Sequence, residues 1–528
     1  MTYVLAYDIG TTGVKTCLFS LGKQITLLAS AQEGYGLYLL ENGGAEQDPE
    51  EWWQAMCRTT RALFQKTDVT PSQIAGLSFC SQMQALVLVD ADGTPVRRAM
   101  SYMDQRAGDE LKKGLAYGVQ IAGANVGRLL KCLSATGAVP SSVKDPVWKY
   151  KWVQAHEPKN FAKAKWWLDV KECLQMRCTG RAVMTEDSAY ATLIYDTKKC
   201  AWSETLCRMF GVDMSHLPPV AHAADRIGGL TEKAAGELGL VPGTPVFGGG
   251  GDASLIGVGA GASAVGRTHI YCGTSGWVST VTDKQLVDVD AMIAAIVGAQ
   301  KGRYNYFAEM ETAGKCLEWV KDHLALDEIG VYLDKKDVTG SQETVYASLY
   351  DYLTETVRNI PAGCGGVVFT PWLHGNRCPF EDPAAAGMFF NIRLDTGKTE
   401  LIRAVLEGVC FHLRWMLECQ AKKVRTSNPV RFVGGGALSD VTSQILADVT
   451  GRTIQTVASP QNAGSVGAAA VMAVGLGIAD NLDAVGDMIP VEKTFEPDAA
   501  HKAVYDRNYA VFRKLYACNK ANFRALNG

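Results

Sequence analysis

The chain has 528 residues, of which 47% are hydrophobic and 20% charged, and its formal net charge is −3 at pH 7. A chain of this length is too long to fold around a single hydrophobic core, so we expect two or three domains. The small net charge excludes a general attraction to nucleic acid or to an anionic membrane. Fifteen cysteines without a C-x-x-C pair, and a start without a basic leader, predict a cytoplasmic protein. The longest small-apolar run, residues 466–479, is too short to span a bilayer.

The first quarter of the chain predicts strands followed by a helix. Residues 3–40 have the alternating pattern of paired strands. Residues 46–65 predict a helix, with Asp48 as N-cap and Pro49 at the first helical position. Two short buried strands are predicted at 74–81 and 85–90, and mostly helical structure from about 109 to 215.

The middle of the chain repeats its beginning. Residues 244–262 predict a strand, a glycine run and a helix, and 268–281 predict a hairpin around Gly273-Thr274-Ser275-Gly276. The first hairpin has Gly10-Thr11-Thr12-Gly13 at the same place. Such a repeat about half a chain apart indicates two related domains with a cleft between them.

The last part of the chain predicts three further elements. Residues 430–451 predict a strand, three glycines and a helix, and 462–477 a helix of small residues against which another backbone can pack closely. The tail from 499 onward predicts an amphipathic helix with a structural role.

The glycine turns have two interpretations. A glycine turn closes a hairpin, and this alone explains Gly10 and Gly13. Backbone N–H groups in such a turn, together with Thr or Ser hydroxyls, also suit an anion. Asp8 and Lys15 beside the first turn add groups that hold a phosphate and its magnesium. The glycines at 434–436 either form an ordinary strand–helix connection or let a nucleotide approach the positive end of a helix dipole.

Two aspartates are the candidates for chemistry. Asp252 follows Gly248–Gly251 and is either a helix N-cap or a general base beside a closely approaching substrate. Asp8 is either an Asx-turn residue or a magnesium-associated carboxylate. If both face one cleft, Asp8 positions magnesium, directly or through water, and Asp252 accepts the proton of an attacking hydroxyl.

Other nucleotide and catalytic motifs are absent from the sequence. Residues 257–262 fit G-x-G-x-x-A, but they lie inside a predicted helix and no acidic residue ends a second strand about 20 residues later. No Walker, zinc-protease or hydrolase-elbow motif is present.

Taken in order, the motifs resemble the FGGY family of carbohydrate kinases, and within it the xylulokinases. The segments that carry the resemblance span nearly the whole chain: YDIGTTGVKTCLF, AEQDPEEWW, SQMQALVLVD, SYMDQRA, FGGGGDASLIGVGAGA, YCGTSG, AGKCLEW, FTPWLHGNRCPFEDPAAAGMFFNI, LIRAVLEGVCFHLR and FVGGGALSDVTSQILADVTGR. The resemblance implies an α/β fold of two ribonuclease-H-like (actin-like ATPase) domains, residues 1–254 and 255–528, with ATP, Mg²⁺ and a sugar in the cleft. It also makes a homodimer a reasonable expectation.

The resemblance assigns roles by position. Asp8 matches the magnesium-associated aspartate and Asp252 the catalytic base. The phosphate and nucleotide positions are Thr11, Thr12, Lys15, Gly273, Thr274, Ser275, Gly314, Glu318, Gly435, Gly436 and Asp440. The sugar-facing positions, besides Asp252, are Gln82, Met83, Gln84, Tyr102 and Asp104.

The departures from the family pattern fall on the sugar side. Where xylulokinases usually have G-Q-M-H-G, this chain has Ser81-Gln82-Met83-Gln84-Ala85, so Gln84 replaces the sugar-facing histidine. Ala253 and Tyr102 replace a usual Asn or Gln and a usual Trp, and P-Y-x-x-G-E-R becomes 371–377, PWLHGNR. Because unpaired buried polar groups are costly, such changes should alter which hydroxyls are recognised.

The sequence therefore predicts ATP-dependent phosphorylation of a terminal hydroxyl of a ketose, D-xylulose or a close relative. A second hypothesis is a kinase for another polyol or sugar acid, such as gluconate or glycerol, since Ser81 and the M-D-Q-R-A segment also resemble gluconate kinases. A third is a nucleotide- and sugar-binding sensor with little catalysis, against which the retention of Asp8, Asp252 and both turns argues.

Overall fold

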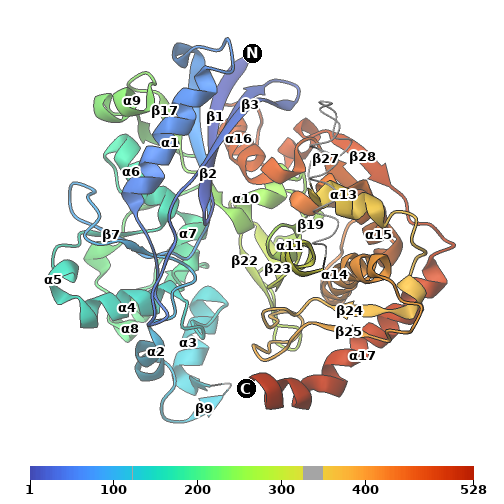
Figure 1. The fold of residues 1–528 in the computed structure, drawn as a ribbon. Coiled ribbons are helices and arrows are strands. Elements are labelled where there is room, and N and C mark those ends of the chain that lie inside the picture. Colours follow the sequence, from blue (N-terminus) through green and yellow to red (C-terminus); the bar gives the residue numbers. More distant parts are fainter. Residues whose placement is uncertain (122, 325–348) are drawn as a thin grey trace.

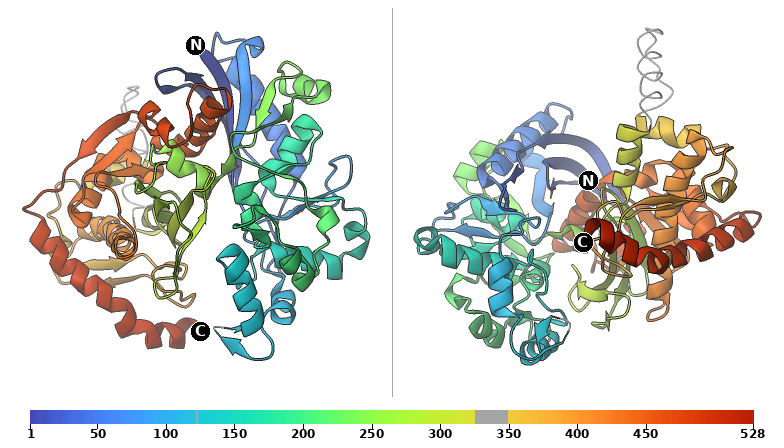
Figure 2. Two further views of the ribbon diagram at one scale, coloured as in Figure 1. Left: turned by 180° about the vertical axis from the view of Figure 1, so that it is seen from behind. Right: turned by 60° about the horizontal axis from the view of Figure 1, so that its bottom comes forward.

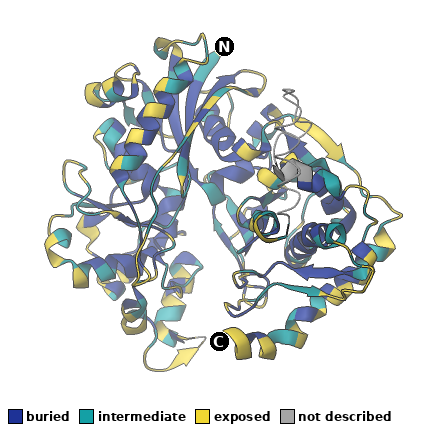
Figure 3. Cartoon of the chain, in the orientation of Figure 1, coloured by how far each residue is buried: buried dark blue, intermediate teal, exposed yellow. Residues whose placement is uncertain are grey.

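Two mixed β-sheets organise the chain, one in each half, and helices cover them (Figure 1). The computed structural model describes residues 1–121, 123–324 and 349–528. In Figure 3 the central strands of both sheets are mostly buried, and exposed positions lie on the edge strands Ile25–Gly34 and Val491–Phe495 and on the outer helices and loops.

The N-terminal sheet has the strand order β16-β17-β6-β1-β2-β3. Its strands are β1 (Thr2–Ile9), β2 (Gly13–Leu21), β3 (Ile25–Gly34), β6 (Ile74–Ser81), β16 (Arg226–Gly229) and β17 (Pro245–Phe247), and the short β18 (Gly250–Gly251) also pairs with β6. β1 is antiparallel to β2 and parallel to β6. The predicted first hairpin and the buried strand at 74–81 are both confirmed.

The C-terminal sheet repeats this arrangement. Its order is β21-β22-β23-β20-β19-β26-β27-β28, with β19 (Thr268–Cys272), β20 (Gly276–Thr282), β21 (Val287–Asp288), β22 (Ile293–Val297), β23 (Tyr304–Met310), β26 (Val430–Val433), β27 (Ile454–Val457) and β28 (Val491–Phe495). The run β23-β20-β19-β26-β27-β28 matches β3-β2-β1-β6-β17-β16 strand for strand, including which neighbours are parallel. The duplication indicated by the two glycine turns is therefore present in the topology.

Each face of the N-terminal sheet has its own core, because successive side chains of a strand point to opposite faces. Leu5 and Tyr7 of β1 belong to a core shared with α1 (Pro49–Phe64) and α6 (Val170–Thr179). Helix α1 begins as predicted, since the Asp48 carboxylate accepts a hydrogen bond from the Glu50 N–H and Pro49 is the first helical residue. The opposite face presents Val4 and Ala6 to a different core.

Two helices of small residues lie between the sheets, α10 (Asp252–Gly259) and α16 (Ala463–Gly475) (Figure 1). Their core combines Val4 of the first sheet with Trp277 of the second. The two helices touch backbone to backbone: a β-carbon on Gly259 would lie 1.8 Å from the Ala463 carbonyl oxygen. The prediction that this small-residue helix permits close packing is confirmed.

The remaining helices pack around the two sheets. They are α2 (Gly108–Gly114), α3 (Val126–Thr136), α4 (Pro146–His156), α5 (Pro158–Phe161), α7 (Glu186–Ala191), α8 (Glu204–Phe210), α9 (Glu232–Leu238), α11 (Gly314–His323), α13 (Leu349–Thr356), α14 (Lys398–Ala421), α15 (Asp440–Thr450) and α17 (Lys502–Asn527). The amphipathic tail forms α17, which runs along the outer side of the C-terminal half (Figure 2). Over the described ranges, no helix has the length and apolarity that a membrane crossing requires.

Short strands complete the fold. They are β4 (Tyr38–Leu39), β5 (Ala45–Gln47), β7 (Val87–Val89), β8 (Ala99–Met100), β9 (Gln120–Ile121), β10 (Ala124–Asn125), β11 (Trp166–Leu168), β12 (Met184–Thr185), β13 (Tyr195–Asp196), β14 (Ala201–Trp202), β15 (Val220–Ala221), β24 (Val368–Thr370) and β25 (Met388–Phe390).

Candidate active site

The fold brings Asp8 and Asp252 together at the end of the N-terminal sheet. Asp8 of β1 and Gly250 of β18 both pair with Cys80 of β6, so they lie two strands, or about 10 Å, apart. Asp252 follows two residues later as the first residue of α10, and Gly251 is the N-cap. Asp8 lies within a strand. The Asx-turn and N-cap alternatives for the two aspartates are therefore wrong.

The two carboxyl groups are electrostatically linked. Burial raises the pKa of Asp252 to about 7, opposed by a hydrogen bond from the Ala253 N–H, and the charges of Asp8 and Glu309 raise it further. Burial also raises the pKa of Asp8, opposed by Lys15 and by Cys80. A carboxyl group with a pKa near 7 is suited to accept a proton near neutral pH.

The hairpin of the first glycine turn is hydrogen-bonded, through Lys15, to Gln461 and Asn462, which come just before α16. The Gly10 N–H donates to the Gly13 carbonyl oxygen over 2.9 Å and closes the turn. The Lys15 ammonium donates to Asn462 Oδ1 at 2.8 Å and to the Gln461 carbonyl at 3.1 Å. Two of the three N–H groups of the Lys15 ammonium therefore donate to protein oxygens, and the third can donate to a ligand. Thr11 and Thr12 lie at the tip, half-buried and exposed.

The second glycine turn supports the start of α11. The Gly314 N–H donates to the Gly273 carbonyl at 2.7 Å, and the Ala313 N–H to the Thr274 carbonyl at 3.1 Å. A β-carbon on Gly314 would lie 2.4 Å from the Gly273 carbonyl oxygen, so glycine is required at this approach. Three predicted nucleotide positions, Gly273, Thr274 and Gly314, therefore form one unit. Ser275 completes the turn, and the half-buried Glu318 lies one helical turn along α11.

The third glycine segment packs on the strand that leads to the second turn. Gly434 has φ +94°, and a β-carbon there would lie 2.5 Å from the Cys272 carbonyl. A β-carbon on Gly436 would lie 2.8 Å from the Cys272 sulfur, whereas Gly435 is exposed and faces open space. Asp440, the first residue of α15, pairs with Lys493 at 2.9 Å. Gly435 and Gly436 therefore adjoin the second turn, and the Asp440 carboxylate has a partner of its own.

The predicted sugar-facing segment begins next to the strand ends that carry the two aspartates. The Gln82 N–H donates to the Ile9 carbonyl at 2.8 Å, and its side-chain amide donates to Gln47 at 2.8 Å. Its Oε1 atom is buried and has no hydrogen-bond partner in the described part of the chain. Met83 covers the glycine before Asp252, because a β-carbon on Gly251 would lie 2.0 Å from the Met83 sulfur. This corner thus combines a free buried acceptor with the Asp252 carboxyl group.

Gln84 is held in a conformation unusual for a non-glycine residue, with φ +63°. Its N–H donates to Asp169 Oδ2 at 2.8 Å, and its carbonyl accepts from the Lys149 ammonium at 2.7 Å. These two buried residues fix the backbone of Gln84 through its N–H and carbonyl groups. They make no contact that depends on the side chain at position 84, so another side chain could stand there on the same backbone. Tyr102 is more exposed, and its hydroxyl lies 3.5 Å from Thr11 Oγ1.

Asp104 has its carboxylate fully engaged. It accepts from the Ala45 N–H at 2.9 Å and pairs with Arg106 at 2.6 Å, and its side chain is fully buried. Of the predicted sugar-facing side chains, Asp104 is the one that the protein itself already satisfies.

The pair of aspartates fits the coordination chemistry of magnesium. Mg²⁺ keeps several water ligands and binds through one or two carboxylates and substrate phosphates. Asp8 offers one such carboxylate, and Gly464 leaves space beside it, since a β-carbon there would lie 3.1 Å from Asp8 Oδ2. The described residues form no cluster of three or more His, Cys, Asp or Glu side chains, so a closed protein cage is not the type of site present.

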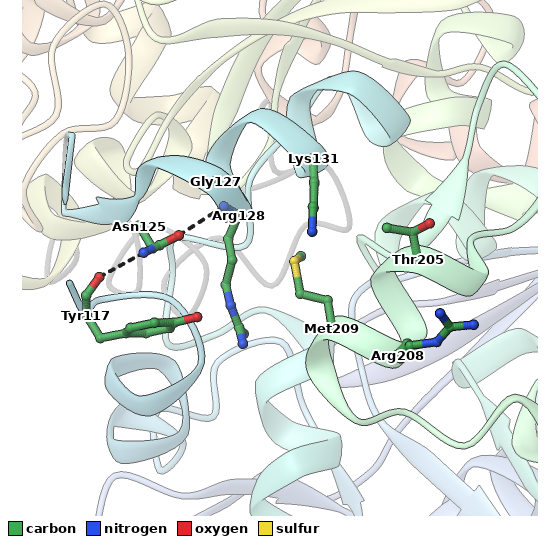
Figure 4. A pocket seen from close by; sticks show the side chains of 8 residues that line it. All are labelled: Tyr117, Asn125, Gly127, Arg128, Lys131, Thr205, Arg208 and Met209. Atoms are coloured by element: carbon green, nitrogen blue, oxygen red, sulfur yellow. Dashed lines mark hydrogen bonds between the residues drawn. The ribbon is translucent and has the colours of Figure 1, made fainter. Parts of the chain in front are cut away.

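A cavity of about 370 Å³ lies elsewhere, between α3 and α8 (Figure 4). Its lining includes none of the predicted residues: Tyr117, Asn125, Gly127, Arg128, Lys131, Thr205, Arg208 and Met209. Arg128 already donates to the Gly114 carbonyl and stacks on Tyr117, and Asn125 caps α3. This cavity is separate from the two aspartates.

Sequence reasoning missed three residues at this site. Asp187 accepts the Gly251 N–H at 2.7 Å, the charge of Glu309 raises the pKa of Asp252, and the charges of both aspartates raise the pKa of Tyr271. No local pattern marks Asp187 or Glu309, because their partners are 64 and 57 positions away in the sequence. Tyr271 carried a signal, since it stands as far before Gly273 as Asp8 stands before Gly10.

Comparisons with known proteins agree over the whole chain. The model of the FGGY family of carbohydrate kinases, N-terminal domain, matches residues 3–259, and that of its C-terminal domain matches 269–476. A xylulose kinase of Bacillus subtilis is 26% identical over 524 residues, covering 98% of both chains. A gluconokinase of Bacillus licheniformis is 28% identical over 521 residues, covering 97% of this chain and 95% of the relative. The crystal structure of ligand-bound xylulose kinase from Lactobacillus acidophilus matches with a TM-score of 0.83 over 100% of both chains, at 24% identity.

Proposed function

The chain belongs to the FGGY family of carbohydrate kinases, and from this premise we propose that it transfers the terminal phosphoryl group of ATP to a terminal hydroxyl of a ketose, with D-xylulose as the first candidate. The observation that carries the proposal is the Asp252 carboxyl group. It stands at the start of α10 beside Asp8, with a pKa raised by burial to about 7. A general base of this kind is what the activation of a sugar hydroxyl requires.

Asp252 is assigned the proton transfer. The substrate hydroxyl oxygen forms a bond to the γ-phosphorus while its proton passes to the Asp252 carboxylate. The bond from the γ-phosphorus to the bridging oxygen breaks, and ADP leaves. Asp187 and Met83 hold the backbone just before the base, through the Gly251 N–H and by contact with Gly251.

The nucleotide is assigned to the three glycine segments. Thr11, Thr12 and the remaining N–H of Lys15 would contact phosphates from the N-terminal half, and Gly273, Thr274 and Ser275 from the C-terminal half. Gly314, Glu318, Gly435, Gly436 and, near the start of α15, Asp440 would line the adenosine. Asp8 would hold magnesium, which supplies neutralisation of phosphate charge.

The charges near the sugar-facing segments favour a neutral sugar over a sugar acid. The nearby buried cations are engaged, because Arg106 pairs with Asp104 and Glu46, and Lys149 donates to Gln84. A gluconate carboxylate would need an available cation or several donors. The similarity to a gluconokinase keeps gluconate as the second candidate.

A panel of ketoses, aldonates and polyols with Mg²⁺ and ATP, followed by ADP release, tests the proposal. We expect D-xylulose or a close ketose to give the highest kcat/KM. A highest value for gluconate would select the second candidate. ATP binding without any sugar-stimulated ADP release would contradict the kinase proposal and favour the sensor hypothesis. We further propose a cytoplasmic setting, which agrees with fifteen free thiols.

A further inference from the structure

Tyr271 occupies in the C-terminal hairpin the place that Asp8 occupies in the N-terminal hairpin. Asp8 stands two residues before Gly10 and pairs across the hairpin with Lys15. Tyr271 stands two residues before Gly273 and pairs across its hairpin with Trp277. The duplicated topology therefore directs an acid from one sheet and a phenol from the other to corresponding positions.

The Tyr271 ring is held rigidly. It stacks on Trp277 with ring centroids 3.9 Å apart and planes 22° from parallel. The Trp277 indole N–H donates to His269 Nε2 at 3.0 Å. Burial lowers the pKa of His269 to about 3, which keeps this imidazole neutral and its Nε2 atom an acceptor. The position of the phenol is thus fixed by side chains that do not titrate near neutral pH.

The phenol oxygen lies against the second glycine turn, and the charges of the two aspartates act on it. A β-carbon on Gly273 would lie 2.1 Å from this oxygen. Burial, followed by the charges of Asp252 and Asp8, raises the pKa of Tyr271, so the hydroxyl keeps its proton. Within residues 1–121, 123–324 and 349–528 the Tyr271 hydroxyl has no hydrogen-bond partner, and the residue is half-buried. It is a fixed donor without an acceptor.

We propose that Tyr271 donates its O–H to an oxygen of the terminal phosphoryl group of ATP, and so is a catalytic residue of the reaction proposed above. The location supports this contact, since the hydroxyl lies against the second glycine turn and the charge of the proposed base reaches it. Its neutrality also matters, because a third carboxylate at this place would repel the triphosphate. The inference rests on the proposed function for its substrate, but it is tested without sugar turnover.

The first test is nucleotide binding to Tyr271→Phe, measured by calorimetry with Mg²⁺. The probes are adenylyl imidodiphosphate, which has a terminal phosphoryl group, and ADP, which lacks it. We expect affinity for the first to fall roughly ten- to hundredfold, the range for a hydrogen bond to a charged group, and affinity for ADP to stay unchanged. Equal affinities of the variant and the wild type for both probes would overturn the inference.

Tyr306→Phe is the matched control. Tyr306 of β23 is buried, and its phenol oxygen, like that of Tyr271, has no partner in the described part of the chain. Both substitutions remove only a hydroxyl group and keep the ring; at position 271 the phenylalanine ring still stacks on Trp277. Both variants should therefore unfold at the wild-type temperature. We expect Tyr306→Phe to bind both nucleotides like the wild type. A loss of affinity for both nucleotides in Tyr271→Phe alone would indicate a packing role and overturn the inference.

Kinetics with the best sugar separate the two proposals. Tyr271→Phe should lower kcat/KM for ATP roughly ten- to hundredfold and leave the KM for the sugar unchanged, because the lost contact is to the terminal phosphoryl group of bound ATP. If the wild type phosphorylates no sugar, the proposed function fails, and the binding ratio still decides the role of Tyr271. If the wild type is active and Tyr271→Phe equals it, only this inference fails.

Discussion

The two hairpins that open the two sheets have the same topology and different chemistry. In each hairpin, a turn of glycines and hydroxyl-bearing residues joins two antiparallel strands. The first strand of each hairpin also has a parallel neighbour on its other side. The N-terminal hairpin pairs Asp8 with Lys15, whereas the C-terminal hairpin pairs Tyr271 with Trp277. The second turn is also tighter, closing from Gly273 to Ser275, while the first closes from Gly10 to Gly13.

This difference indicates a division of labour between duplicated elements. The N-terminal half provides both carboxylates, Asp8 and Asp252, at the end of one sheet. The C-terminal half provides backbone donors, hydroxyls and open glycine surface. A triphosphate between them would meet Asp8 and its magnesium on one side and a glycine turn with hydroxyl donors on the other, where Glu309 of β23 adds a carboxylate that acts on Asp252.

The largest test of this division removes the proposed base. Asp252→Asn keeps the size of the side chain and loses the proton acceptor, so kcat should fall roughly 10²- to 10⁴-fold. Sugar affinity, measured by calorimetry, should change little. Asp92→Asn, at an exposed turn, is the control and should be fully active. Near-normal turnover of Asp252→Asn would place the chemistry outside the N-terminal carboxylates.

The pH dependence of turnover tests how a residue of the C-terminal half acts on Asp252, the proposed base in the N-terminal half. Asp252 accepts a proton only when ionised, so turnover should rise with pH through about 7 and fall about tenfold per pH unit below it. Glu309 of β23 raises the pKa of Asp252, so Glu309→Gln should move the midpoint of the rate profile to lower pH. A midpoint that stays in place, or moves upward, would contradict this link.

Glu311→Gln is the control for the pH experiment. Glu311 pairs with Arg377, as Glu309 does, at 2.7 Å. It therefore tests whether loss of any partner of Arg377 shifts the profile. We expect the midpoint to move less in Glu311→Gln than in Glu309→Gln.

The contact between the halves is tested by Gly259→Ala. The new β-carbon would lie 1.8 Å from the Ala463 carbonyl, so α10 and α16 must move apart, at a cost of about 1–3 kcal/mol in the free energy of unfolding. Gly236→Ala, an exposed helical glycine with open space around it, should instead stabilise by about 0.5–1 kcal/mol. Chemical denaturation measures both, and equal stability of the two variants would contradict the close packing.

The smallest expected effect concerns sugar recognition. Gln84→His should change the ranking of sugars by roughly two- to tenfold in kcat/KM, the range for one hydrogen bond. The backbone should be unaffected, because Asp169 and Lys149 hold the main chain of Gln84 and not its side chain. Gln24→His, at an exposed site, serves as the control. An unchanged ranking would show that position 84 does not read the substrate.

Local features of the sequence predicted the elements well. Asp48 and Pro49 marked the start of α1, and the glycine turns marked both hairpins, because caps and turns act over a few residues. The repeat of Gly10–Gly13 at Gly273–Gly276 predicted the duplication. The roles assigned to individual site residues came from family resemblance and stay predictions, as does the boundary between residues 254 and 255.

Contacts between distant segments were not predictable from the sequence. Lys15 and Asn462 are 447 positions apart, and nothing near either residue indicates the other. The approach of Tyr271 to Asp252 depends on the register of two sheets and on the helices between them, which local patterns do not specify. The ion pair of Asp104 with Arg106 was likewise not indicated by the sequence, and its sugar-facing role stays a prediction.

Helix α16 determines whether the two halves of the chain could be produced as separate proteins. It is encoded beyond residue 460, yet it covers the face of the first sheet that carries Val4 and Phe19. A polypeptide ending at the border between the halves would expose that apolar face to water. Neither half is thus a self-sufficient module, and recombination or truncation at that border should yield insoluble fragments.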